Sequence, residues 1–462
     1  MIELSFPGDL TDADELATQL FTTGLSREAC QSKAALLVRA ASALSVTGEA
    51  HSGRPPLGFF VPGRIEVLGK HTDYAGGRTM VAAVERGFCV AALPRDDRQM
   101  IVIDAASGET IVFAADPDLE PQTGKWSNYP MTVVRRVARN FPGAVRGADI
   151  AFVSDLPPGS GMGSSSALIA GVFLALAEVN HLAARDEYWH NIGSKTDLAG
   201  YLGTIENGQS FGTLEGDCGV GTFGGSEDHT AILCAEPNHV SQYAFCPVEF
   251  EKMIPMPPGY LFIVAASGVA AEKTGAAARE KYNTASRLAS TLAELWRCET
   301  GRDDQHLGAA LGSSPDAAER LKAIVKATTD GQSTAGTLLA RLEHFMLESG
   351  EIIPAAGDAL ARGDLRVFGR LVDDSQRAAE QLLGSQTPET TFLAASARRL
   401  GAAAASAFGG GFGGSVWALV ETPRADDFPS AWSDEYSENF PQHTERASFF
   451  ATGAGPAAFR VC

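Results

Sequence analysis

The chain has 462 residues, of which 45% are hydrophobic, and its formal net charge is −19 at pH 7. This length allows two or three domains of ordinary size, and the hydrophobic fraction is sufficient for a buried core. The acidic balance argues against a nucleic-acid partner and against binding to an anionic membrane, because both would need basic surfaces.

The cysteines and the first residues indicate a cytoplasmic protein. Seven cysteines are scattered without a C-x-x-C pair, which fits a reducing compartment and argues against a zinc site. The N-terminus lacks the basic and apolar regions of a signal peptide, and no apolar run has the length of a membrane span. We therefore expect no membrane partner; the sequence leaves the oligomeric state open and permits a monomer.

The first half of the chain is predicted to contain three helical regions and several strands. Residues 10–45 have the spacing of amphipathic helices, and residues 59–112 read mainly as strands. A helix over 131–141 precedes a strand over 150–153, and a long apolar helix follows through residue 179. Short strands are expected at 232–234 and 242–245.

A cluster of prolines near residues 246–260 marks a change in composition. We place a domain boundary there, which gives an N-terminal domain over 1–245 and a C-terminal domain over 246–462. The second half opens with a strand over 261–265 and is then mostly helical, before strands at 416–420 and 457–461. Strands and helices that are segregated in this way predict an α+β fold.

Residues 156–167, which read LPPGSGMGSSSA, lie between the strand at 150–153 and the long apolar helix. A glycine-rich turn that leads into a helix leaves several backbone N–H groups without partners inside the helix. The helix dipole adds partial positive charge, and together they form an anion site that commonly binds phosphate. Serine hydroxyls can also donate to phosphate or bind a hard metal ion. This loop therefore predicts a nucleotide site.

Two further glycine-rich segments are residues 62–77, PGRIEVLGKHTDYAGG, and residues 408–415, FGGGFGGS. With the loop at 156–167, they resemble in order the three signature motifs of the GHMP small-molecule kinases, and of galactokinases in particular. The resemblance implies a two-domain fold with the active site in the cleft between the domains. It also implies ATP- and Mg²⁺-dependent phosphorylation of a monosaccharide at its anomeric hydroxyl, with a sugar 1-phosphate and ADP as products.

The same resemblance assigns expected roles to individual residues. Asp228 matches the catalytic aspartate beside the acceptor hydroxyl, and Arg64 matches the arginine near it. Five positions match residues that contact or border the sugar: Glu66, Lys70, His71, Asp73 and Tyr282. The ATP-binding positions are Pro158, Gly159, Ser160, Gly161, Met162, Gly163, Ser164, Ser165, Ser166, Gly410 and Gly411. Ser165 and Glu206 are the candidate Mg²⁺ ligands.

Two residues depart from the galactokinase pattern within the sugar-binding signature. Galactokinases usually carry glutamate at the position of Lys70 and asparagine at the position of Glu66. Lysine cannot accept a hydrogen bond, so one hypothesis is a substrate altered at C6, such as a hexuronic acid. The alternative is a swapped Lys70–Glu66 ion pair that leaves galactose as the substrate. A catalytically weak sugar sensor is a third hypothesis, against which the presence of Ser165, Arg64 and Asp228 argues.

Overall fold

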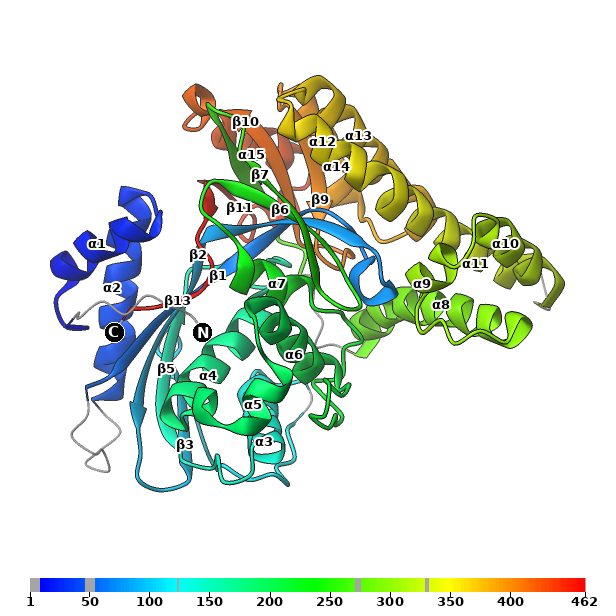
Figure 1. Cartoon of the computed structure of the whole chain (residues 1–462). Helices are drawn as coiled ribbons and strands as arrows, with labels where there is room; N and C mark the ends of the chain where they lie inside the picture. Colours follow the sequence, from blue (N-terminus) through cyan, green and yellow to red (C-terminus); the bar gives the residue numbers. More distant parts are fainter. Residues whose placement is uncertain (1–8, 46–54, 123, 271–275, 329–331, 462) are drawn as a thin grey trace.

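The computed structural model describes residues 9–45, 55–122, 124–270, 276–328 and 332–461. Two sheets of unequal size organise these residues, and helices pack on both (Figure 1). Within the described chain, β3 and β5 pair in parallel and the other strand pairs of the two sheets are antiparallel. The predicted α+β class is confirmed.

The larger sheet has nine strands in the main order β13-β1-β2-β5-β3-β4, with β12 and β6 pairing β2, and β7 pairing β6. Its strands are β1 (Leu57–Leu68), β2 (Arg78–Pro94), β3 (Gln99–Asp104), β4 (Thr110–Ala114), β5 (Ala148–Ser154), β6 (His239–Ala244), β7 (Glu249–Pro255), β12 (Ala454–Gly455) and β13 (Phe459–Arg460). The smaller sheet has the order β11-β8-β10-β9, with β8 (Tyr260–Ala266), β9 (Ala404–Phe408), β10 (Ser415–Glu421) and β11 (Ser448–Thr452).

Helices cover both faces of the larger sheet, which explains why β1 is buried on both sides. Alternate side chains of a strand face opposite ways, so Phe60 packs with α2 (Arg27–Leu44) while Phe59 and Val61 join the core beneath α4 (Ser164–Val179). The other helices of this part are α1 (Ala13–Leu20), α3 (Asn128–Asn140), α5 (Asp186–Asn191), α6 (Lys195–Asn207) and α7 (Glu227–Cys234). Figure 1 shows α1 and α2 on the opposite side of the sheet from α4 and α6.

The smaller sheet is also packed between helices. Helices α8 (Ala276–Thr300) to α11 (Gln332–Phe345) form a separate group at one end of the molecule (Figure 1). Trp417 of β10 packs against Phe368 of α13 (Leu365–Ala378) on one face, and Val416 joins a core with Trp432 of α15 (Phe428–Asn439) on the other. The helices are α8 (Ala276–Thr300), α9 (Leu307–Gly312), α10 (Ala317–Thr328), α11 (Gln332–Phe345), α12 (Ile353–Ala361), α13 (Leu365–Ala378), α14 (Pro388–Arg399) and α15 (Phe428–Asn439).

The strand expected at 232–234 is wrong, because these residues form the last turn of α7. A short apolar run cannot be distinguished from a buried helical segment by periodicity, whereas the acidic residues Glu227 and Asp228 favour a helix start at that position. The helix expected after the serines begins at Ser164. None of the helices in the described part of the chain combines the length and hydrophobicity needed to cross a membrane.

The sheets do not divide the chain at residues 245 and 246, where the sequence predicts the domain boundary. Strand β7 lies beyond this point and pairs with β6 in the larger sheet. Strands β12 and β13, close to the C-terminus, also pair with β2 and β1. The two-domain division therefore stays a prediction, and any boundary has to allow the chain to return to its first sheet.

Candidate active site

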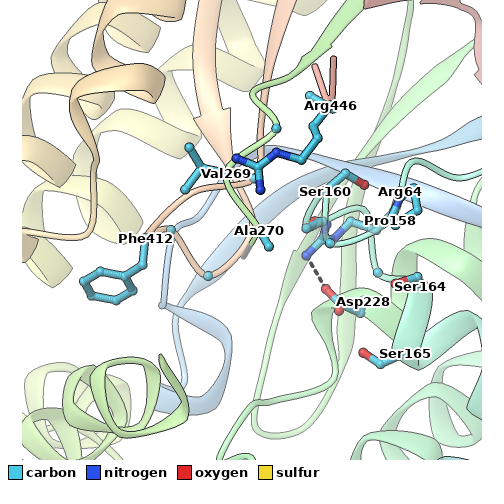
Figure 2. A pocket seen from close by; sticks show the side chains of 18 of the residues that line it. Arg64, Pro158, Ser160, Ser164, Ser165, Asp228, Val269, Ala270, Phe412 and Arg446 are labelled. Carbon is cyan, nitrogen blue, oxygen red and sulfur yellow. Dashed lines mark hydrogen bonds and ion pairs between the residues drawn. The ribbon is translucent and has the colours of Figure 1, made fainter. Parts of the chain in front are cut away.

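A cleft of about 650 Å³ lies where loops from the two sheets meet. The phosphate loop, which we define as residues 156–167, forms one wall, and residues that follow β8 and β9 form the other. Figure 2 shows Ser164, Ser165 and Asp228 on one side, with Val269, Phe412 and Arg446 on the other. The three glycine-rich segments that the sequence singled out therefore converge at one place.

The phosphate loop has the backbone of an anion cradle. Gly159, Gly161 and Gly163 have φ angles of 62°, 71° and 75°, a region that favours glycine over residues with a side chain. The loop ends at the N-terminus of the 16-residue helix α4, which supplies free N–H groups and partial positive charge. This arrangement fits the phosphates of ATP.

The two glycine-rich loops touch each other directly. A Cβ atom on Gly409 would lie 2.8 Å from the carbonyl oxygen of Gly161, so only glycine allows this approach. The Ser415 hydroxyl donates a hydrogen bond of 2.8 Å to the carbonyl of Ser160. The loop after β9 is thereby fixed against the phosphate loop, and it contributes Gly410 and Gly411 to the cleft.

Not every residue of the predicted ATP set faces the cleft. Pro158, Gly159, Ser160, Gly161, Gly163, Ser164 and Ser165 line it. Met162 is fully buried in the hydrophobic core, and Arg64 N–H donates to its carbonyl at 3.0 Å. Ser166 is also fully buried; its hydroxyl lies 2.8 Å from Oε2 of Glu206 and 3.1 Å from Oδ2 of Asp228. Both residues support the loop from beneath.

Arg64 of β1 and Asp228 of α7 form an ion pair of 2.5 Å at the floor of the cleft (Figure 2). The Nε of Arg64 also lies 3.1 Å from Glu227, so one guanidinium bridges two adjacent carboxylates. Burial alone would lower the pKa of Arg64, but Asp228 and Glu227 raise it above its usual value. The guanidinium is therefore a permanent positive charge beside Asp228.

A small polar recess opens next to the cleft and shares Arg64, Asp228 and Gly410 with it. The sugar candidates Glu66, His71 and Asp73 line this recess, and so does Glu206. The recess encloses about 30 Å³, which is less than a hexose occupies. The predicted catalytic pair thus lies between a phosphate cleft and a pocket of sugar-binding candidates.

Two of these candidates are held by defined hydrogen bonds. His71 Nε2 lies 3.0 Å from the Gly410 carbonyl, which can only accept, so this nitrogen carries the hydrogen. Asp73 accepts from the N–H of Glu227 at 3.1 Å, and a Cβ atom on Gly225 would lie only 2.3 Å from its Oδ2. Tyr282 belongs to α8, but its side chain lies outside the described residues.

Lys70 is placed differently from the other sugar candidates. It is buried, with 1% of its surface exposed, and it is not among the residues that line the recess. Its Nζ donates to the hydroxyls of Ser406 at 2.9 Å and Ser375 at 3.4 Å. Lys70 and Glu66, both described by the structure, do not form the hypothesised ion pair with each other. A hexuronic acid in the recess would face carboxylates and not Lys70.

Glu66 is 4% exposed, and its Oε1 has no hydrogen-bond partner among the described residues. Burial raises the pKa of Glu66 to about 7, against the effect of Arg64 and Lys70, which lower it. Burial likewise raises the pKa of Glu227 well above its usual value, although Arg64 opposes this shift. Burial therefore disfavours the ionised forms of Glu66 and Glu227 in the recess.

The candidate metal ligands supply oxygen atoms, which is the donor type that Mg²⁺ prefers. Ser165 lines the cleft, and Glu206 lines the recess beside Asp228. Glu206 also accepts hydrogen bonds from Ser166 and Thr222 and lies 3.2 Å from His229 Nε2. The described residues contain no group of three His, Cys, Asp or Glu side chains able to hold a metal. The donors fit a magnesium ion that takes most of its ligands from phosphate and water.

Three groups of functional interest were not assigned a role from the sequence. Glu227 stands next to Asp228, so its place beside Arg64 could have been suspected from adjacency alone. Ser406 and Glu348 hold the Lys70 region: Glu348 Oε1 accepts from the Gly69 N–H at 2.8 Å and from Ser375 at 2.9 Å. Nothing in the local sequence links residues so far apart in the chain.

Comparison with known proteins agrees with this geometry. Residues 49–94 match the galactokinase galactose-binding signature, 128–211 the GHMP kinases N terminal domain and 358–438 the GHMP kinases C terminal domain. Galactokinase of Chloroflexus aggregans is 28% identical over 395 residues, covering 84% of this chain and 90% of the relative. Galactokinase of Haemophilus influenzae is 25% identical over 400 residues, covering 86% and 94%.

The solved structure of Lactococcus lactis galactokinase, complexed with galactose, aligns with a TM-score of 0.73 and 24% identity. The alignment covers 91% of this chain and 98% of that one, and it supports the same fold. The fold and the paired family domains define a GHMP kinase. Within that superfamily the chain carries the galactokinase galactose-binding signature and is similar to galactokinases, and the superfamily's kinases use ATP.

Proposed function

We propose that this protein transfers the γ-phosphoryl group of ATP to the anomeric hydroxyl of galactose or a related monosaccharide, giving a sugar 1-phosphate and ADP. The observation that carries the proposal is the ion pair between Arg64 and Asp228, because both residues line the phosphate cleft as well as the recess. A phosphoryl donor in the cleft and an acceptor in the recess would meet at this pair. The curated relatives are galactokinases, which supports the choice of sugar.

In the proposed reaction the N–H groups of the phosphate loop hold the donor, and the acceptor hydroxyl lies beside Asp228. The Asp228 carboxylate accepts the hydroxyl proton as the sugar oxygen bonds to the γ-phosphorus and the bond to ADP breaks. Arg64, which is ion-paired with Asp228, stabilises negative charge on the transferring group. Mg²⁺, held by Ser165 and Glu206, would neutralise charge on the phosphates.

The test is ATP consumption with a panel of free sugars and Mg²⁺, together with identification of the phosphorylated position by ³¹P NMR. Asp228→Asn should lower kcat by about 10²–10⁴-fold, as expected for loss of a general base. Asp426→Asn, which makes the same change at an exposed position, is the matched control. A full rate in Asp228→Asn would contradict the role of Asp228, and binding without turnover in the unmodified protein would favour a sugar sensor.

A further inference from the structure

We propose that the recess selects a sugar that carries a protonated amino group, and that Glu66 is the residue that selects it. The inference rests on the proposed function, because it concerns the acceptor of the same reaction. Five carboxyl groups line the recess, whereas the basic side chains there are Arg64 and His71; the acidic residues are Glu66, Asp73, Glu206, Glu227 and Asp228.

Four of the five carboxyl groups already have partners within the protein. Glu227 and Asp228 share the Arg64 guanidinium. Glu206 accepts from the Ser166 hydroxyl at 2.8 Å, and Asp73 accepts from a backbone N–H at 3.1 Å. Glu66 is different, because its buried Oε1 receives no hydrogen bond and its carboxyl group forms no ion pair with a described residue, whereas Glu227 Oε1 lies 3.1 Å from Arg64 Nε. An acceptor that is 96% buried in the wall of a ligand recess indicates that the ligand supplies the donor.

Lys70, whose charge also acts on Glu66, does not satisfy this acceptor. Lys70 comes from the same segment as Glu66, but its ammonium donates to Ser406 of β9 and to Ser375 of α13. Both serines lie beyond residue 260 in the chain, so Lys70 connects the larger sheet to the region of β9 and α13. Its side chain does not line the recess, whereas Glu66 does. Lys70 and Arg64 are near enough to lower the pKa of Glu66, whereas Glu348 and Asp73 raise it.

An ammonium group complements this wall better than a hydroxyl does. It has three donors and no acceptor, whereas an ionised carboxylate only accepts. A charge-assisted hydrogen bond is about twice as strong as a neutral one. A cation beside Glu66 would also favour the ionised form of this carboxyl, which burial otherwise opposes. A carboxylated sugar, in contrast, would place a sixth negative group against the same wall.

The experiment compares kcat/KM for galactosamine, galactose, N-acetylgalactosamine and galacturonate at about pH 6.5, where such an amine is protonated. The N-acetyl sugar keeps a substituent at the same carbon without the charge. We expect galactosamine to exceed galactose by about tenfold, which corresponds to one charge-assisted hydrogen bond in place of a neutral one. Galacturonate should be the poorest of the four.

Glu66→Gln removes the charge with little change of shape, and the ratio of galactosamine to galactose should then fall by about tenfold. Glu343→Gln removes the same charge from an exposed position on α11 and should leave that ratio unchanged. Rescue of the ratio in Glu66→Asp would assign the effect to the carboxylate and not to a disturbed fold.

Galactosamine no better than galactose, or a ratio that is the same in Glu66→Gln, would overturn the inference while leaving the kinase assignment intact. If no sugar supports ATP consumption, the proposed function fails instead. Calorimetric binding of galactosamine and galactose to the unmodified protein and to Glu66→Gln then decides the inference: tighter binding of the amino sugar that depends on Glu66 supports it, and equal binding refutes it.

Discussion

Lys33 provides the sharpest stability prediction, because it links the N-terminal helices to the phosphate loop. This residue of α2 is 1% exposed, and its ammonium forms an ion pair with Asp155. Asp155 also accepts a hydrogen bond of 2.8 Å from the Gly87 N–H, and it directly precedes Leu156, the first residue of the loop. Lys33→Met keeps the apolar stem and removes the charge, so Asp155 loses its cation.

Removing one partner of a fully buried ion pair costs about 3–5 kcal/mol. The Asp155 side chain is 25% exposed, so water can replace part of the lost interaction. We therefore expect Lys33→Met to lower the free energy of unfolding by about 2–3 kcal/mol, below the range for a fully buried pair. Because Asp155 positions the start of the phosphate loop, the KM for ATP should rise as well, with less change in the KM for the sugar.

The assay is urea unfolding followed by tryptophan fluorescence, combined with steady-state kinetics in both substrates. Lys322→Met is the matched control, since Lys322 also forms an ion pair, with Glu319, but is 35% exposed. An exposed pair of this kind is worth about 0–1 kcal/mol. If Lys33→Met cost no more than Lys322→Met, the proposed link between the N-terminal helices and the loop would be refuted.

Two further predictions concern the recess. The pKa of Glu66 is about 7 in the folded protein against 4.5 in the unfolded chain, so the folded protein binds this proton more tightly. Protonated Glu66 therefore contributes to the free energy of unfolding. This contribution is complete below pH 4.5 and is lost as the pH rises through 7. Denaturation at several pH values should therefore show Glu66→Gln gaining about 3 kcal/mol over the unmodified protein between about pH 5 and 8.5; a constant difference would contradict the raised pKa. Gly225→Ala would force Asp73 to move, since the new Cβ would lie 2.3 Å from its Oδ2, and should raise the KM for the sugar about tenfold at unchanged KM for ATP. Gly336→Ala, with nothing within 4 Å of its Cβ, is the control, and an equal effect there would count against a specific role for Asp73.

The local structure that the sequence predicted around the candidate site depends on nearby residues. A strand, a glycine-rich turn and a serine-rich helix start are contiguous, so the backbone of residues 156–167 follows from nearby residues alone. Helix α4 could be expected for the same reason, although its first residue was placed a few positions late. The α+β class likewise follows from patterns that extend over whole elements.

The parts that were missed depend on contacts between distant residues. The direction of the Lys70 side chain is set by Ser375 and Ser406, some 300 positions away, and no local pattern carries that information. The turn of α7 at 232–234 was mistaken for a strand because three apolar residues have no measurable period. A strand was predicted at 457–461, and β13 lies within it, but its pairing with β1 in the first sheet joins residues about 400 positions apart and could not be predicted from a local pattern.

This return has a consequence for synthesis of the protein on the ribosome. Strand β13 covers the edge of β1, where Phe59 pairs with Arg460 and Phe60 with Phe459, and Phe459 is 3% exposed in the core beneath α2. Translation proceeds from the N-terminus at about 5–20 residues per second, so β1 emerges tens of seconds before its neighbour exists. Throughout that interval the edge of β1 at Phe59 and Phe60 is unpaired and open to association with other nascent chains.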